Sequence, residues 1–481
     1  MQNTRLIELL RTFKEKEFLG LEDFISSKYF NKNTQIIELF SHVKKYFPLF
    51  DSEELSKQNL YNKIFGNKKY SDETMRTLIS GLMKLTKKYL IQIELEKRNP
   101  YSNLFLLEQL RVRDQENLFE YEFSKADKFL EENLYREGEY FLARYLSDFM
   151  NFYGHPSGFK DSNLESNLIY KIGASLERYF LLEAMDVNYQ MLTRKIKMNY
   201  QPKYIFLEHI KSKIESNEYN DAPLLPLKYY SFMAIENRDN EEYFEKCQEL
   251  YFQSFDKISE FERGAIHLAM VNYCMLSISA GKEKYFEKSV VLYKFALEHN
   301  LYFQNNKYLL PYMYHNIVKN ATYIGDNKWA YNFIFEYKNK VPPEVRKEVV
   351  NVSYAKYYFE TGDLDSALKH INKINPQNAQ LKFEVLTLFI KIFYELDYVE
   401  SVYSSIESLK RFVKTNNSLA PSFITGGKYF STYMRKFMDL KEKFRKNDLD
   451  YLRKEISSIQ DFGLINRKWI LQKIDAVLKK R

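Results

Sequence analysis

Residues that break regular structure are scarce in this chain. Its 481 residues include only 14 glycines and 11 prolines, well below ordinary usage of roughly 7% and 5%. Glycine supplies tight turns and proline ends helices, so a chain poor in both consists mainly of long regular elements with short connections. The 40 tyrosines and 38 phenylalanines provide ample apolar volume for a core. A disordered chain is therefore excluded.

Apolar residues recur every three or four positions through almost the whole chain, which is typical of amphipathic helices. Residues 36–47 form one such run and residues 75–89 another. Ser71 is a predicted N-cap for the second run. Residues 91–95 alternate as a strand would, but the preceding helix can continue through them. We predict an all-α protein.

A helix-end and helix-start pattern repeats in the second half of the chain. Gly325-Asp326 is followed by Ala330, and Gly362-Asp363 by Ala367, five residues after the glycine in both cases. The two glycines are 37 residues apart, and Leu396-Asp397 follows after 34 more. We expect the glycine to end one helix in a left-handed conformation and the aspartate to cap the next. The small alanine would let the two helices approach closely.

The segment Ala355-Lys-Tyr-Tyr-Phe-Glu-Thr-Gly-Asp-Leu-Asp-Ser-Ala367-Leu-Lys-His-Ile resembles the tetratricopeptide repeat. The resemblance covers about residues 310–410. It departs from the family where Leu396 replaces the turn glycine, and where the step from Ala367 to Pro376 is shorter than the family's. The resemblance implies a right-handed superhelix of stacked antiparallel helical hairpins, a tetratricopeptide-like α-solenoid. Such a scaffold would bind a peptide or protein along its concave side.

We expect three parts: an N-terminal helical module over 1–100, a degenerate helical-repeat solenoid over 101–425, and basic capping helices over 426–481. In the first part, the helices over 59–89 resemble the winged-helix module of bacterial regulators that carry tetratricopeptide-like repeats downstream. Their basic residues gather at the end of the second helix, where the helix dipole alone favours cations, and no wing hairpin follows.

Charge is unevenly distributed along the chain. The formal net charge is +8, with +5 in residues 1–100, −4 in each of the next two hundreds and +10 in residues 401–481. Basic ends and an acidic middle suggest separate surfaces for separate partners. The alternative is that long helices carry solvated lysines for solubility.

The C-terminal segment supplies the candidate site. A helix is predicted from about Lys428 to Lys446, with aromatic residues on its buried side. Five cations flank that buried stripe and form a candidate surface for an anionic partner: Lys428, Arg435, Lys436, Lys443 and Lys446. Three interpretations stay open: a polar cap that keeps a solenoid soluble, a surface for an acidic protein or anionic lipid, and a nucleic-acid surface.

No local motif indicates catalysis, a cofactor or a metal. The seven histidines lack zinc-ligand spacing. Thr425-Gly-Gly-Lys428 only superficially resembles a phosphate-binding loop, and we predict that Gly426-Gly427 is a break between helices. Gly154-His-Pro-Ser-Gly158 is predicted to be an inter-helix loop. We therefore expect a non-enzymatic protein without cofactor.

The expected compartment is the cytoplasm. The N-terminus lacks the apolar run of a signal peptide, and no stretch is long and apolar enough to predict a transmembrane segment. Cys247 and Cys274 are predicted to be buried free thiols. The function predicted first is a protein-interaction scaffold that binds a protein or peptide partner. The alternative is a nucleic-acid-binding protein or transcriptional regulator that uses the basic ends.

Overall fold

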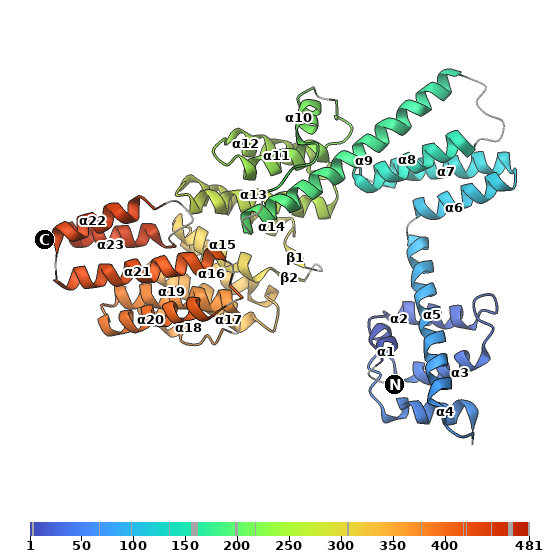
Figure 1. Cartoon of the computed structure of the whole chain (residues 1–481), viewed down its shortest axis with the longest axis horizontal. Helices are drawn as coiled ribbons and strands as arrows, with labels where there is room; N and C mark the ends of the chain where they lie inside the picture. Colours follow the sequence, from blue (N-terminus) through green and yellow to red (C-terminus); the bar gives the residue numbers. More distant parts are fainter. Residues whose placement is uncertain are drawn as a thin grey trace. The chain divides into compact units, whose positions relative to one another are not determined.

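A computed structural model describes residues 1, 4–66, 68–97, 99–133, 135–154, 162–197, 201–216, 218–304, 307–376, 378–416, 418–419, 421–443, 445–459 and 465–479. These residues form 23 α-helices, four short 3-10 helices and two strands of two residues each (Figure 1). The prediction of an all-α protein is confirmed. The contacts divide the chain into two compact units, residues 1–133 with 143–173, and residues 134–142 with 174–481.

The first five helices share one apolar core. The elements of this part are α1 (Arg5–Leu10), α2 (Glu15–Ser26), α3 (Thr34–Val43), η1 (Lys44–Tyr46), η2 (Glu53–Leu55), α4 (Lys57–Phe65) and α5 (Asp72–Lys97). Leu21, Leu39 and Leu82 are fully buried in this core. Ser71 caps α5 as predicted, because its Oγ accepts a hydrogen bond of 3.2 Å from the backbone N–H of Thr74. No strand lies among the described residues of 4–97.

Four long helices follow: α6 (Asn99–Val112), α7 (Glu116–Asn133), α8 (Gly138–Gly154) and α9 (Ser162–Lys197). Arg144 on α8 ties two of them together. Its guanidinium contacts Asp148 on the same helix at 3.0 Å and pairs with Asp127 on α7. Asp148 is buried, so this pairing satisfies a carboxylate that would otherwise be costly to remove from water. Residues 155–161, which hold most of the predicted loop at 154–158, lie outside the described residues.

The next elements are α10 (Leu207–Glu215), α11 (Leu224–Glu236), α12 (Glu242–Ser254), η3 (Phe255–Lys257), α13 (Glu260–Ser279), α14 (Lys284–Glu298), β1 (Phe303–Gln304) and β2 (Tyr308–Leu309). The two strands pair antiparallel, a feature that the sequence did not predict. Gly281 ends α13 with a positive φ of 87°, the left-handed conformation that glycine adopts readily. Cys247 and Cys274 are buried and free, as predicted.

The predicted repeats lie in α15 (Pro311–Tyr323), α16 (Asn327–Tyr337), η4 (Lys338–Lys340), α17 (Arg346–Thr361), α18 (Leu364–Ile371), α19 (Ala379–Glu395) and α20 (Val399–Thr415). Gly325 and Gly362 end α15 and α17 with φ of 83° and 86°. Ala330 and Ala367 are completely buried. The glycine turns and the close approach at the alanines are therefore confirmed.

Of the two predicted aspartate caps, one is confirmed and one is wrong. Asp363 accepts a hydrogen bond of 3.0 Å from the backbone N–H of Ser366 and caps α18. Asp326 makes no such bond to α16. Its carboxylate instead pairs with Lys294 on α14 at 2.7 Å, so an ion pair with the preceding hairpin replaces the predicted cap. Asp397, after Leu396, takes the positive φ, 56°, that glycine takes in the two earlier turns.

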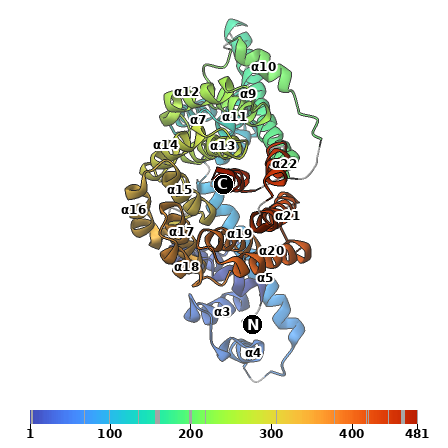
Figure 2. The same cartoon turned by 90° about the vertical axis from the view of Figure 1, so that its left-hand side faces the viewer.

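Successive helices in this part pack on their neighbours. Figure 2 shows α14 to α22 following one another round an arc. In that view α15, α17 and α19 lie on the side that faces the C-terminal helix, and α16, α18 and α20 lie on the other side. We call α15, α17 and α19 the inner helices. Paired neighbouring helices of this kind are compatible with a helical-repeat solenoid.

The chain ends in α21 (Pro421–Lys443), α22 (Lys446–Ser457) and α23 (Arg467–Lys479). The predicted break at Gly426-Gly427 is wrong, because both residues are buried inside α21. A Cβ on Gly427 would lie 2.6 Å from Cε2 of Phe383 and 2.8 Å from Cγ1 of Val413. The glycine is needed for close packing rather than for a turn. Helix α21 therefore runs across the boundary that was predicted between residues 425 and 426.

Gly427→Ala should lower the free energy of unfolding by about 1–3 kcal/mol, because the added methyl overlaps two buried side chains. Gly173→Ala is the matched control, since a Cβ at that exposed position of α9 meets nothing within 4 Å. It should stabilise the protein by up to about 1 kcal/mol through helix propensity. Urea unfolding followed by circular dichroism measures both. Equal effects of the two substitutions would contradict the packing role.

Candidate functional site: a lysine row on the inner helices

The predicted C-terminal surface is divided between two helices. Lys428, Arg435, Lys436 and Lys443 lie on α21, whereas Lys446 begins α22. All five side chains are exposed. The single helix predicted over 428–446 is therefore wrong, because α21 ends at Lys443.

Acids from neighbouring helices neutralise part of this surface. Arg435 lies 3.7 Å from Glu407 on α20 and 3.5 Å from Asp439. Lys436 lies 3.4 Å from Glu455 on α22. Two of the five predicted cations thus already have counter-ions in the folded chain. Exposed pairs of this kind add little stability, but they reduce the positive potential that an anionic partner would meet.

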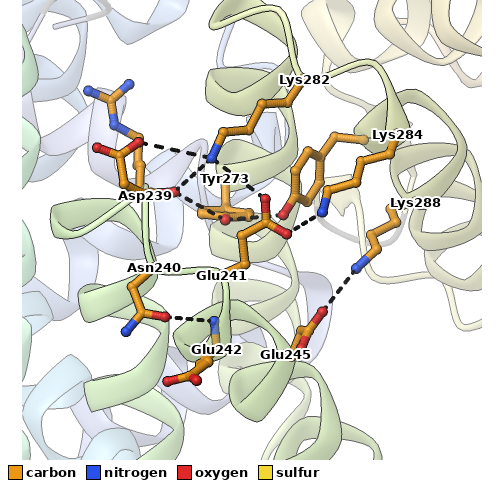
Figure 3. Close-up of polar contacts among 11 residues, drawn as sticks. Asp239, Asn240, Glu241, Glu242, Glu245, Tyr273, Lys282, Lys284 and Lys288 are labelled. Atoms are coloured by element: carbon orange, nitrogen blue, oxygen red, sulfur yellow. Dashed lines mark hydrogen bonds and ion pairs between the residues drawn. The ribbon is translucent and has the colours of Figure 1, made fainter.

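A second polar cluster joins two hairpins of the second unit (Figure 3). Lys282, between α13 and α14, donates to the carbonyl oxygen of Arg238 at 3.3 Å and lies 3.6 Å from Glu241. Glu241 also pairs with Lys284. One turn along both helices, Lys288 and Glu245 are 3.7 Å apart.

Buried hydroxyls reinforce the same junction. Tyr273 donates to the carbonyl oxygen of Arg238 at 3.4 Å, and its hydroxyl lies 3.2 Å from that of Tyr285. Because acids at the start of α12 pair with lysines at the start of α14, the cluster fixes the packing of two hairpins. We assign it a structural role.

A third group of charged residues lies on the inner helices. Lys319, Lys356 and Lys391 stand on α15, α17 and α19. They are 37 and 35 residues apart, close to the period of the helical repeat. Each lies five or six residues before the turn residue of its hairpin, Gly325, Gly362 or Leu396. We call these three residues the lysine row.

Glu384 on α19 contacts both of the other inner helices. Its carboxylate lies 2.6 Å from the ammonium of Lys356 and 3.5 Å from Nε2 of His315 on α15. Burial alone would raise the pKa of Glu384, but the charges of Lys356 and His315 outweigh it and hold that pKa well below its usual range. Burial in turn lowers the pKa of His315.

Lys391 is enclosed more tightly. Its side chain is 13% exposed and lies 3.7 Å from Glu360 on α17. The ammonium sits over the ring of Phe359 at 4.3 Å and reaches within 5.8 Å of the ring of Trp469 on α23. Burial lowers the pKa of Lys391 to about 8, and the positive charges of Lys319 and Lys356 act in the same direction.

Lys319 combines two properties that rarely occur together. Its side chain is exposed to solvent. Nevertheless desolvation, and then the charge of Lys356, lower the pKa of its ammonium group. No ion pair or hydrogen bond joins its ammonium to another residue in the part of the chain that the structure describes.

The C-terminal helix borders the lysine row. Trp469 Nε1 donates to Glu395 of α19 at 3.0 Å, and Lys473 pairs with the same carboxylate at 2.6 Å. On the same helix, Lys468 pairs with Glu283, which precedes α14, and with the hydroxyl of Tyr323 on α15. Helix α23 therefore contacts both the beginning and the end of the inner-helix series.

The lysine row was not among the predicted site residues. Its signal was present, because three lysines recur with the period of the glycine turns. The three lysines of the row face two carboxylates, those of Glu360 and Glu384. The group therefore keeps a formal charge of +1. Among the described residues no group of three or more His, Cys, Asp or Glu is arranged to hold a metal ion. The arrangement can attract and hold anionic groups.

Comparison with known proteins identifies no relative of this chain. A scan against models of protein families and a search of curated proteins both give no match to this chain. No helix within the described ranges combines the length and apolar character needed to span a bilayer.

Glu384→Gln should lower the free energy of unfolding at pH 7 by about 1–3 kcal/mol, because it leaves Lys356 crowded without its counter-charge. The depressed pKa of Glu384 contributes stability above the unfolded pKa of about 4.3. That contribution is lost as pH falls through the lower folded value. The difference from wild type should therefore shrink in strong acid.

Urea unfolding at a series of pH values measures this difference. Glu336→Gln, at an exposed position of α16, is the control and should change stability by less than about 0.5 kcal/mol. A loss for Glu384→Gln that stays constant from neutral pH to strong acid would contradict the ionic role.

Proposed function

We propose that this chain is a non-enzymatic interaction protein that binds an acidic segment of a protein partner along the lysine row. The observation that carries the proposal is the recurrence of Lys319, Lys356 and Lys391 at equivalent places on three successive inner helices. A repeated structural unit presents the same side chain at a regular interval, which suits an extended ligand better than a small molecule.

Lys319 supports a concave binding surface. A side chain that contacts water and is still crowded from several directions is expected in a hollow rather than on a convex face. In Figure 2 the inner helices lie on the inside of the arc, which supports this proposal. A right-handed, tetratricopeptide-like superhelix, as the sequence resemblance implies, would give this geometry. The proposed ligand would lie in its groove.

The spacing of the helices suggests the spacing of the ligand's acids. Packed helices are about 8–10 Å apart axis to axis, and α15 packs on α17, which contacts α19. An extended peptide advances about 3.3 Å per residue. Carboxylates at every third position would therefore meet successive lysines of the row. A peptide with the same composition but clustered acids would satisfy only one or two of them.

Fluorescence anisotropy with two labelled peptides of about 12 residues tests this proposal. One carries glutamate at every third position and the other has the same residues with the glutamates contiguous. The spaced peptide should bind several-fold more tightly, and salt should weaken both. Equal affinity for the two peptides, or no binding at low salt, would contradict the proposal.

Substitution of the most exposed lysine locates the site. Lys319→Glu should weaken binding of the spaced peptide by about tenfold, because it replaces an attraction by a repulsion. Lys328→Glu makes the same charge change at an exposed position of the outer helix α16 and should change affinity by less than about twofold. Circular dichroism confirms that both variants fold. Equal losses would show that only net charge matters.

The pH dependence of peptide affinity should follow the titration of Lys391. Below its pKa of about 8 the ammonium is charged and attracts a carboxylate, so affinity for the spaced peptide should fall as pH rises from about 7 to about 9.5. Lys391→Arg keeps its charge across this range. The variant should lose the part of this pH dependence that Lys391 contributes, while Lys328→Arg keeps all of it. Identical pH profiles for wild type and Lys391→Arg would contradict the assignment.

The alternative function is a nucleic-acid-binding protein or transcriptional regulator that uses the basic ends. At the C-terminal end the pairing of Arg435 with Glu407 and of Lys436 with Glu455 weakens this alternative. Of the five predicted cations, Lys428, Lys443 and Lys446 have no counter-ion among the described residues, and a polar cap accounts for them equally well. We place the protein in the cytoplasm, in keeping with its two buried free thiols.

A further inference from the structure

Two adjoining cavities open on the surface of the N-terminal helices. The larger, of about 590 Å³, is lined by residues 30–36 and, on α5, by Gly81, Lys84, Leu85 and Lys88. The smaller, of about 400 Å³, is lined by Phe24, Tyr29, Phe30, Lys88, Ile91 and Gln92. Phe30 and Lys88 belong to both. The first cavity is mainly polar and the second mainly aromatic and apolar.

The sequence builds these cavities in two ways. Gly81 lets α5 approach α3 closely, because a Cβ there would lie 2.6 Å from Cδ1 of Ile36. The buried side chain of Asn31 fixes the loop before α3: its Nδ2 donates to the carbonyl oxygen of Ile25 at 3.0 Å, and its Oδ1 accepts from the N–H of Asn33 at 2.9 Å. The loop is thereby held in one conformation over α5.

This loop presents aromatic rings to solvent. Phe30 stacks on the buried Phe24 with ring centroids 4.0 Å apart, and Tyr29 meets Phe30 edge-on at 4.9 Å. Tyr29 is 86% exposed, so both faces of its ring are accessible. A large ring held out by a fixed loop contributes little to the core. It is available to stack on a flat ligand.

The lysines beside these rings are not neutralised. Lys32, Lys84 and Lys88 are exposed, and no ion pair or hydrogen bond joins their ammonium groups to any other described residue. No Asp or Glu lines either cavity. This differs from the C-terminal surface, where acids from neighbouring helices pair with Arg435 and Lys436.

We propose that these two cavities bind single-stranded nucleic acid, with phosphates beside Lys32, Lys84 and Lys88 and a base stacked on Tyr29. Cationic side chains beside an accessible aromatic ring are what a single strand requires. An acidic peptide would use the lysines but would leave the ring without a partner. A duplex keeps its bases stacked on one another, so it offers no free base face to Tyr29. The site uses other helices than the lysine row and does not depend on the proposed function.

Fluorescence anisotropy of the full-length chain with a labelled strand of about 12 nucleotides, either oligo(dT) or oligo(U), tests the proposal. The single strand should bind at low salt, and its affinity should fall steeply as salt rises. A duplex of the same length should bind at least about fivefold more weakly. No binding of the single strand at low salt, or equal affinity for the duplex, overturns the proposal.

Charge reversal on α5 tests the phosphate contacts. Lys84→Glu with Lys88→Glu should weaken strand binding by at least about tenfold. Lys87→Glu is the matched control, because this exposed lysine lies on the same helix but lines neither cavity. It should weaken binding by no more than about twofold. If the loss of strand affinity per reversed charge is the same at Lys87 as at Lys84 and Lys88, the site assignment is overturned. Circular dichroism confirms folding of each variant.

Substitution of Tyr29 separates stacking from simple charge attraction. Tyr29→Ala should weaken strand binding by about tenfold, whereas Tyr29→Phe keeps the ring and should bind as wild type does. Both changes are at an exposed position, so the fold should tolerate them. Full binding by Tyr29→Ala, together with equal competition by polyglutamate, would make this a site for acidic peptides and overturn the proposal. Competition by uridine monophosphate as strong as by the strand would also overturn it.

Discussion

From α11 to α21 the apolar sides of neighbouring described helices pack against one another, and the charged contacts of the inner helices depend on that packing. The left-handed glycines at 325 and 362 end one helix, and the buried Ala330 and Ala367 let the next lie close to it. Gly427 serves the same purpose inside α21, where Phe383 and Val413 leave no room for a methyl. Close packing along the series is what brings charges of α15, α17 and α19 within reach of one another.

Charges on the inner helices are tolerated because they are paired across hairpins. Glu384 faces Lys356 and His315, and Glu360 faces Lys391. Removing an ion from water is costly unless a counter-ion receives it. The pairs therefore stabilise the same inter-hairpin contacts that the apolar residues make. Lys319 is the exception, since it has no such partner among the described residues, and it supplies the excess positive charge on which the proposed recognition of an acidic segment rests.

The sequence predicted the elements better than the surfaces. Periodicity and turn residues identify helices, so the glycine turns, the Asp363 cap and the Ser71 cap were all found. Gly426-Gly427 was wrongly predicted to be a break, because the sequence of a glycine pair is the same whether it ends a helix or lets a side chain from another helix pack closely. The C-terminal patch looked more basic than it is, because Glu407 and Glu455 reach it from other helices. The lysine row and the N-terminal cavities depend on which faces converge, which one helix's pattern does not specify.

Cross-linking of the full-length chain with a short lysine-directed reagent, followed by mass spectrometry, tests the convergence of the lysine row most directly. If the three lysines converge, links should form from Lys319 to Lys356 and from Lys356 to Lys391, at a pH high enough for all three amines to react. Lys328 and Lys369, on the outer helices α16 and α18, should not link to them. Links from the lysine row to those outer lysines, with none within the row, would contradict the account.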